Sequence, residues 1–369
     1  MKICHITSVH DHDDIRIFQK ECVSLAKNDE FQVYLVAEGD SIEVEGVSII
    51  GLGERPRKRL ERFLNFADQA YNKAIHIDAD LYHFHDPELL RFAKKLKKRG
   101  KIVIYDSHEI ITEQIKIKSY IPKFLRGFIS RVFEAYETRT CRYIDAIIFP
   151  CPIDGKHPFE GKANKYIYIN NLPIINEQAL QIKRSFLPRA ICCVGSLTEA
   201  RGIENLVKAC YISNTKLILA GDISPSSFKE HLNNMKEFDN VEYRGFCNKE
   251  QVAEIYKSSG LLVSNIISVG QYGNPGNLPT KVYESMMFAI PVILSDVKYN
   301  RDFIDKYECG LIANENDPFD IAEKINYIFD NQEKALLMGE NGRNAVLEYF
   351  NWSIEEKKLV DLYMSFKSD

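Results

Sequence analysis

Polar residues that could do chemistry follow apolar, strand-like runs at several points in the chain. The first such stretch, residues 8–16, holds His10, Asp14 and Arg16 and contains no glycine. A dinucleotide-binding enzyme would carry G-x-G-x-x-G here, because its backbone must approach a pyrophosphate. We therefore expect no NAD or FAD at this point. Contact with an acceptor substrate and a purely structural role both remain open, and metal ligation is the weakest reading.

A second stretch, residues 81–86, ends with histidines and an aspartate. The period of two along a strand places His83 and His85 on one face, and Asp86 follows at the carboxyl end. Either histidine could be an ordinary core residue. His85 and Asp86 are nevertheless well placed to reach a substrate, because ligands of parallel sheets bind beside the carboxyl ends of the strands.

The third stretch, Tyr105–Glu109, combines Asp, His and Glu at the end of a strand. Unpaired polar groups at a buried strand end cost free energy, so a functional role is favoured. His108 could donate a hydrogen bond to a substrate hydroxyl. Glu109 could orient that substrate or contact the acceptor.

In the second half, residues 194–202 read as strand, turn and helix. Gly195 and Gly202 permit close approach of the backbone, and Arg201 stands at the expected helix start. A cation is unfavourable at the positive end of a helix. A bound phosphate would reverse that penalty, because Arg can donate two hydrogen bonds to its oxygens.

Residues 276–293 are the most specific stretch. Pro279 precedes an expected helix that carries Lys281 and Glu284 in its first turns, and an apolar strand follows Pro291. The unpaired amides of a helix start favour anions. Glu284 alone proves little, since an acidic residue near a helix start also suits the helix dipole.

The elements that must position these residues alternate between strands and helices, which is typical of parallel α/β layers. The expected strands are 2–7, 32–37, 47–50, 81–85, 101–106, 146–149, 190–194, 216–220, 241–245, 260–264 and 291–294. The expected helices include 15–28, 87–98 (capped by Asp86), 202–211, 249–257, 280–288 and 352–366.

Two successive arrays of this kind predict two Rossmann-like domains with a ligand between them. We expect an amino-terminal domain at 1–171, a linker at 172–189, a second domain at 190–350 and a closing helix at 351–369. The length of 369 residues suits a protein of two domains. The net charge of −4 argues against a dedicated nucleic-acid binder. The nine cysteines are scattered, which favours reduced thiols, and the sequence suggests a cytoplasmic protein without a signal peptide or membrane span.

With these motifs the chain resembles the retaining glycosyltransferases of family 4, which have the GT-B architecture. The resemblance rests on residues 14–21 (DIRIFQKE), 82–89 (YHFHDPEL), 106–109 (DSHE), 194–202 and 278–284. It implies two domains facing across a cleft, with the last helix crossing back to the amino domain. It also implies transfer from a nucleotide-sugar, most simply a UDP-sugar, without a metal or other cofactor.

The resemblance further implies roles for individual residues. Glu284 would hold the donor ribose, Arg201 would neutralise the leaving diphosphate, and His108 would contact the donor sugar. The residues expected at the donor are Ser196, Arg201, Phe246, Asn277, Leu278, Thr280, Lys281 and Glu284. The residues expected at the acceptor are His10, Asp14, Arg16, Asp86 and Glu109.

The chain departs from the family pattern at two positions. Gly276 stands where the family usually has Glu, and Ser196 stands where Arg is common. A nucleotide-sugar-binding protein with impaired catalysis is therefore an alternative, and a sugar-nucleotide epimerase is another.

The expected acceptor is a glycan, most simply a lipid-linked one at the inner face of the plasma membrane in surface polysaccharide synthesis. Residues 55–62 hold five cations and one acid, and residues 114–144 hold seven cations and two acids among regularly spaced apolar residues. Such a pattern suits peripheral contact with an anionic membrane. An ordinary packed helix with a solvated face would give the same pattern.

Overall fold

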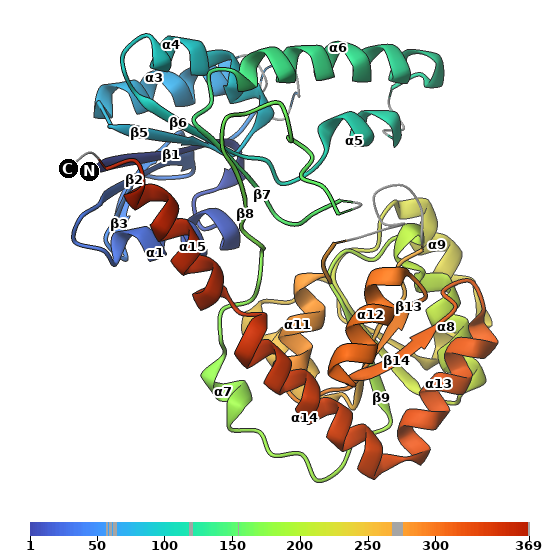
Figure 1. Ribbon diagram of the computed structural model, residues 1–369. Coiled ribbons are helices and arrows are strands. Elements are labelled where there is room, and N and C mark those ends of the chain that lie inside the picture. Colours follow the sequence, from blue (N-terminus) through green and yellow to red (C-terminus); the bar gives the residue numbers. More distant parts are fainter. Residues whose placement is uncertain are drawn as a thin grey trace. The chain divides into compact units, whose positions relative to one another are not determined.

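The computed structural model describes residues 1–56, 58, 61, 65–117, 121–153, 155–267 and 276–367. The chain divides into two compact units. The first unit comprises Met1–Asn171 and Trp352–Asp369, and the second comprises Leu172–Asn351. Each unit is built around one sheet whose strands run almost entirely parallel (Figure 1).

The sheet of the first unit has the strand order β3-β4-β2-β1-β5-β6-β7-β8. Its strands are β1 (Lys2–Asp11), β2 (Gln32–Glu38), β3 (Ile42–Val44), β4 (Val47–Gly51), β5 (Leu81–Phe84), β6 (Ile102–Asp106), β7 (Ala146–Phe149) and β8 (Tyr166–Tyr168). Only the short β3 pairs antiparallel, with β4. The central strand β5 is buried along its whole length and β1 is buried from Ile3 to Ser8, as expected of a parallel sheet covered on both faces.

Helices cover both faces of this sheet. Figure 1 shows α3 (Ala67–Ile77), α4 (Ala93–Lys97) and α6 (Lys123–Cys141) on one side and α1 (Val23–Ala26) with α15 (Trp352–Met364) on the other. The remaining helical segments are η1 (Ile15–Cys22), η3 (Pro87–Phe92) and α5 (Ile111–Ile117). Along β1, Cys4 and Ile6 face the α3 side, whereas Ile3 belongs to the core that includes Trp352 and Tyr363.

The last helix belongs to the first unit. Trp352 at the start of α15 is buried, and its indole Nε1 donates a hydrogen bond of 2.8 Å to Ser24 Oγ. Glu355 accepts hydrogen bonds from the backbone amide and the side chain of Asn170. Apolar burial and these polar contacts together attach the carboxyl terminus to the unit that contains the amino terminus.

The second unit repeats the plan with the strand order β11-β10-β9-β12-β13-β14. Its strands are β9 (Ala190–Val194), β10 (Lys216–Ala220), β11 (Val241–Tyr243), β12 (Leu261–Ser264), β13 (Val292–Ser295) and β14 (Gly310–Ala313). Its helices are α7 (Glu177–Leu180), η4 (Glu199–Arg201), α8 (Ile203–Ile212), α9 (Ser226–Asn233), η5 (Lys236–Asn240), α10 (Lys249–Ser258), α11 (Thr280–Met287), α12 (Lys298–Tyr307), α13 (Pro318–Asp330) and α14 (Gln332–Tyr349).

Several expectations need correction. The segment 172–189 is not a free linker, because Leu172, Ala179 and Leu187 are buried and Arg184 donates to three backbone carbonyls of the second unit. Asp86 does not cap a helix with its side chain. Strands β3, β8 and β14, each three or four residues long, were not expected from the sequence.

The described residues include no helix that is both long and apolar enough to span a membrane.

Candidate functional site

A pocket of about 340 Å³ lies in the second unit at the carboxyl ends of β9 and β12. It brings together four residues that the sequence assigned to the donor site: Ser196, Arg201, Thr280 and Lys281. Its other lining residues are Cys193, Val194, Gly195, Leu262, Val263, Ser264, Asn265, Ile266, Pro279 and Val282.

Glycines shape the wall of this pocket. Gly195 follows β9 with a φ of +120°, and a Cβ placed on the neighbouring Gly221 would lie 1.8 Å from the Gly195 carbonyl oxygen. A side chain at position 221 would therefore push the two loops apart. The loop that carries Ser196 depends on this close approach of two backbones.

Arg201 lies at the end of the short helix η4, and Gly202 in the left-handed conformation then begins α8. Asn265 Nδ2 donates hydrogen bonds of 3.1 Å to the carbonyl oxygens of Gly202 and Glu315, which fixes the turn beside the pocket. The sequence analysis did not single out Asn265. The guanidinium thus stands in the pocket where the amides of a helix start also favour an anion.

Helix α11 begins at Thr280 on the opposite wall of the pocket, directly after Pro279. Lys281 Nζ lies 3.0 Å from Glu284 Oε2. The Asn277 side chain accepts hydrogen bonds from the backbone amide of Leu278 and from the Tyr283 hydroxyl. This part of the chain is ordered around the helix start, although Asn277, Leu278 and Glu284 do not line the pocket itself.

Phe246 is 80% exposed in the loop after β11 and is not a lining residue of this pocket. Its assignment to the donor stays a prediction.

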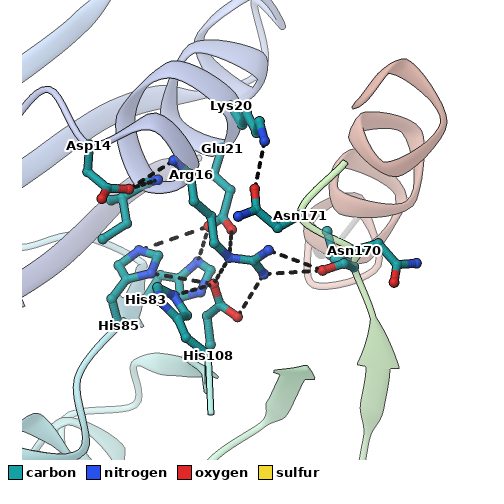
Figure 2. A network of polar contacts seen from close by, with 12 residues as sticks. Asp14, Arg16, Lys20, Glu21, His83, His85, His108, Asn170 and Asn171 are labelled. Carbon is teal, nitrogen blue, oxygen red and sulfur yellow. Dashed lines mark hydrogen bonds and ion pairs between the residues drawn. The ribbon is translucent and has the colours of Figure 1, made fainter. Parts of the chain in front are cut away.

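In the first unit, the expected acceptor residues surround a buried network of charges. Figure 2 shows Arg16 among Glu21, His83, His85 and His108 at the centre of this network. Arg16 Nε and Nη2 donate to the two Asp106 oxygens at 2.8 and 2.9 Å, and the same guanidinium reaches the Ile169 carbonyl oxygen. Burial opposes the charge on Asp106, but Arg16 outweighs it and holds the pKa of Asp106 well below its usual range.

Arg16 is therefore not placed as the sequence analysis expected. It is 5% exposed, and its donors are directed to Asp106, to Ile169 and toward Glu21 Oε1, which lies 3.1 Å from Nε. An acceptor contact by Arg16 does not fit this burial, and we assign it a supporting role in the network instead.

His108 occupies the exposed end of the network. Its Nε2 lies 3.0 Å from Asp106 Oδ2, and its side chain is 23% exposed. The carboxylate orients the ring and favours the tautomer with the proton on Nε2, which leaves Nδ1 as the other polar atom. Glu109, the next residue, has an exposed side chain.

His10, Asp14 and Asp86 lie together beside His108. His10 Nδ1 is 3.2 Å from Asp14 Oδ2, His10 Nε2 is 3.8 Å from Asp86 Oδ1, and the His10 and His108 rings are 5.4 Å apart. Burial alone would lower the pKa of His10, but the hydrogen bond to Asp14 and the nearby Asp86 raise it above its usual value.

Asp14 and Asp86 are each held by backbone amides as well. Asp14 accepts from the amides of Arg16 and Ile17 at the start of η1, and Asp86 accepts from Thr7 Oγ1 and the Ser8 amide. Asp14 is partly exposed, whereas Asp86 is 3% exposed, so only Asp14 and His10 present much surface to a substrate.

Four members of this network were not predicted as site residues from the sequence: His5, Glu21, Asp106 and Tyr363. A signal existed for His5 and Asp106, because both are polar residues within or at the end of otherwise apolar strands. Glu21 and Tyr363 lie on amphipathic helices, where a single polar residue gives no comparable signal.

Residues 181–345 match the family model of glycosyl transferases, group 1. An uncharacterised glycosyltransferase of Methanocaldococcus jannaschii is 25% identical over 197 residues, which are 49% of this chain and 47% of that protein. The spore coat protein SA of Bacillus subtilis is 25% identical over 39% of this chain and 37% of its own length. The matched regions therefore span less than half of each of these relatives.

Solved structures match over almost the whole chain. A sucrose-phosphate synthase from Thermosynechococcus elongatus has a TM-score of 0.75 at 19% identity, covering 99% of this chain and 98% of its own. The Anabaena protein Alr3699/HepE, solved in complex with UDP and glucose, has a TM-score of 0.72 at 12% identity, covering 99% and 100%. The chain thus has the GT-B fold of two Rossmann-like units, and its second unit matches the group 1 glycosyltransferases.

Proposed function

We propose that the protein transfers a sugar from a UDP-sugar to a glycan acceptor, with retention of anomeric configuration and without a metal ion at the diphosphate. The observation that carries this proposal is the pocket of the second unit. It combines Gly195 and Ser196 on a strand–turn–helix loop, Arg201 just before α8, and Thr280 with Lys281 at the start of α11. Exposed amides and two cations around one space suit a diphosphate.

Arg201 is the residue proposed to stabilise the leaving diphosphate. Negative charge grows on that group as the glycosidic bond to the donor breaks, and a preorganised cation lowers the energy of this state. The starts of α8 and α11 supply amides with the same effect. These fixed charges do what a metal ion does in other glycosyltransferases, so no metal ligand set is required here.

Glu284 is proposed to bind the donor ribose. Its carboxylate already lies 3.0 Å from the ammonium group of Lys281, which would direct it while leaving acceptor capacity for ribose hydroxyls. UDP is the proposed nucleotide, because Alr3699/HepE, which shares the fold, binds UDP and UDP-glucose.

In the first unit, His108 is proposed to contact the donor sugar, and Asp106 is its positioning residue. The Asp106 carboxylate holds the ring by Nε2, and Arg16 holds the carboxylate from the other side. His10, Asp14 and Glu109 are proposed to contact the acceptor, and the buried Asp86 is proposed to act through His10.

The acceptor is proposed to be lipid-linked, at an anionic membrane surface. Helix α6 presents Phe124, Phe128 and Val132 at intervals of four residues, with exposed fractions of 83%, 68% and 54%. Lys123 and Arg131 on the same helix are also exposed. A packed helix would bury these aromatic rings, whereas an interfacial helix inserts them among lipids beside its cations.

Vesicle flotation tests this membrane contact. Binding to vesicles that contain phosphatidylglycerol is expected at low salt and is expected to be lost when Phe124 and Phe128 are both changed to Ser. Phe319→Ser is the matched control, because Phe319 is 72% exposed on α13 of the second unit. Equal flotation of all three proteins, or none by the wild type, would refute the contact.

Transfer itself is tested with a panel of UDP-sugars and GDP-sugars and extracted lipid-linked glycans. Release of UDP with formation of a new α-linked product from an α-linked donor is expected, at a rate that added Mg²⁺ does not change. Inversion of configuration, or dependence on Mg²⁺, would contradict the respective part of the proposal.

A nucleotide-sugar-binding protein without turnover is the second candidate. It is favoured by Gly276 and Ser196, where the resembling family usually carries Glu and often Arg. UDP-sugar binding without product from any acceptor would support this candidate.

A further inference from the structure

Three histidines and a glutamate form a fully buried cluster on one face of the sheet in the first unit. His5 lies in β1, and His83 lies in β5. His85 directly follows the last residue of β5, and Glu21 lies in η1. We call these four residues the buried histidine cluster. The pairing of β1 with β5 places His5 directly opposite His83, and His85 follows on the same face.

The hydrogen bonds of this cluster are incomplete. Four of its buried atoms have no hydrogen-bond partner: Glu21 Oε1, Glu21 Oε2, His83 Nε2 and His85 Nδ1. The described part of the chain contains seven such side-chain atoms, and four of them belong to Glu21, His83 and His85. Buried polar atoms without partners are costly, and Glu21, with neither carboxylate oxygen hydrogen-bonded, is the member that most lacks the partner a cation would supply.

The distances within the cluster suit a cation. Glu21 Oε2 lies 4.0 Å from His83 Nδ1 and 4.0 Å from His85 Nε2, which is too far for a hydrogen bond. His5 Nδ1 lies 2.9 Å from His85 Nε2. One ligand atom from each of the four residues lies within 4.8 Å of the others, so small side-chain movements would bring all four to the distance of about 2.0–2.2 Å from a shared ion that Zn²⁺ requires.

The surroundings resemble the outer shell of a metal centre. His85 Nδ1 faces Asp106 Oδ2 at 3.6 Å. Glu21 Oε1 faces Arg16 Nε at 3.1 Å (Figure 2). The Tyr363 hydroxyl on α15 contacts His83 Nδ1 at 2.5 Å and His5 Nε2 at 3.2 Å. Metal-binding histidines and carboxylates are typically oriented by such polar neighbours.

The balance of charges around the cluster also favours a bound cation. Arg16 is shared between Asp106 and Glu21, so one guanidinium stands against two carboxylates.

A second group of possible ligands, His85 with Asp106 and His108, is less suitable, because Arg16 already occupies both Asp106 oxygens.

We propose that the buried histidine cluster binds one divalent cation of the zinc type, through three imidazole nitrogens and one carboxylate oxygen. Nitrogen-rich, four-coordinate sites favour Zn²⁺ over Mg²⁺ or Ca²⁺. The ion holds η1 and β5 together under α15 and takes no part in sugar transfer. It departs from the expectation of a metal-free protein, which rested on the family resemblance.

Metal analysis of the purified protein tests the proposal, independently of any activity. The protein is prepared without a histidine tag or chelator, and a second sample is unfolded with chelator and refolded with Zn²⁺ or Co²⁺. We expect about one ion per folded chain in the refolded sample and the visible absorption of four-coordinate Co²⁺. A folded protein with less than about a tenth of an ion in both samples would show a hydrogen-bonded cluster only and overturn the proposal.

Variants and spectroscopy locate the ion. Glu21→Gln and His85→Asn are expected to lose most of the metal, while His157→Asn retains it. His157 is the matched control, since it is also buried in the first unit with an unpartnered ring nitrogen. X-ray absorption at the zinc edge is measured on the wild type, so its result does not depend on whether a variant folds. Three nitrogens and one oxygen are expected, whereas a sulfur ligand would assign the ion to a cysteine and contradict the proposal.

Discussion

The two units place their polar groups in opposite ways on the same kind of sheet. In the second unit, the pocket is lined by Gly195, Ser196 and Arg201 in the loop after β9 and by the start of α11. In the first unit, buried charged side chains hold one another, and only the outer members reach the surface. The second site therefore depends on loop geometry, and the first depends on contacts among buried charged side chains.

The largest expected effect comes from breaking the buried charge pair. Arg16→Leu leaves Asp106 and Glu21 without their guanidinium and is expected to lower the free energy of unfolding by about 3–5 kcal/mol. Lys298→Ala removes an exposed pair with Asp302 in the second unit and should cost about 0.5 kcal/mol or less. Urea unfolding of both variants measures the contrast, and similar losses would refute the difference between the units.

Arg201→Ala is expected to have the largest effect on activity. Loss of the cation at the diphosphate should lower kcat/KM by about 10²–10³-fold. The fold should be unaffected, because the close approach of Gly221 to Gly195 and the hydrogen bond from Asn265 to Gly202 do not involve the Arg201 side chain. Arg301→Ala is the control, as Arg301 pairs with Asp296 on the surface and does not line the pocket. Steady-state kinetics with normal circular dichroism would confirm the role, and unchanged kcat/KM in Arg201→Ala would exclude it.

Gly221→Ala tests the dependence on backbone geometry. Its Cβ would overlap the Gly195 carbonyl oxygen, and φ is +132°, so a loss of about 3 kcal/mol in unfolding free energy is expected together with weaker nucleotide binding. Gly245→Ala also has a positive φ, of +63°, but no atom lies within 4 Å of its Cβ. Its loss should be only about 1 kcal/mol. Equal losses would mean that strain alone, and not the close approach, matters.

The smallest expected effect concerns pH. The pKa of His10 is raised because Asp14 and Asp86 outweigh its burial. Protonated His10 therefore stabilises the folded protein, and this contribution, fully present below about pH 6.5, is lost as the pH rises through the raised pKa. NMR titration should show a pKa above 6.5 in the wild type and a lower one in Asp14→Asn. A wild-type pKa at or below 6.5 would contradict the assigned contact.

The sequence predicted the second site better than the first, and the reason is the separation of the partners. Ser196 and Arg201 lie on one loop, and Thr280 and Lys281 are neighbours, so a local motif contains most of that pocket. Arg16 and Asp106 are 90 positions apart, and His83 and Tyr363 are 280 apart. Such pairs depend on strand order and helix packing, which the local pattern does not contain.

The fold, like the candidate sites, was predictable from the sequence only in part. Strands with strong apolar patterns, such as 190–194 and 216–220, lie where the sequence indicated. The predicted helix 15–28 is instead η1 followed by α1, because the Asp14 carbonyl oxygen accepts from the amides of both Phe18 and Gln19 and widens the first turn. That wide turn points Arg16 and Glu21 at the sheet, and no local propensity indicates it.

Nucleotide binding by the second unit is the central claim, and a thermal-shift panel of UDP, UDP-sugars, GDP and GDP-sugars tests it most directly. UDP and at least one UDP-sugar should raise the Tm of the wild type by mass action. The shift should be lost in Glu284→Ala and kept in Glu254→Ala, an exposed glutamate on α10 that also pairs with a lysine. No shift at millimolar nucleotide, or equal shifts in both variants, would contradict the assignment of the donor site.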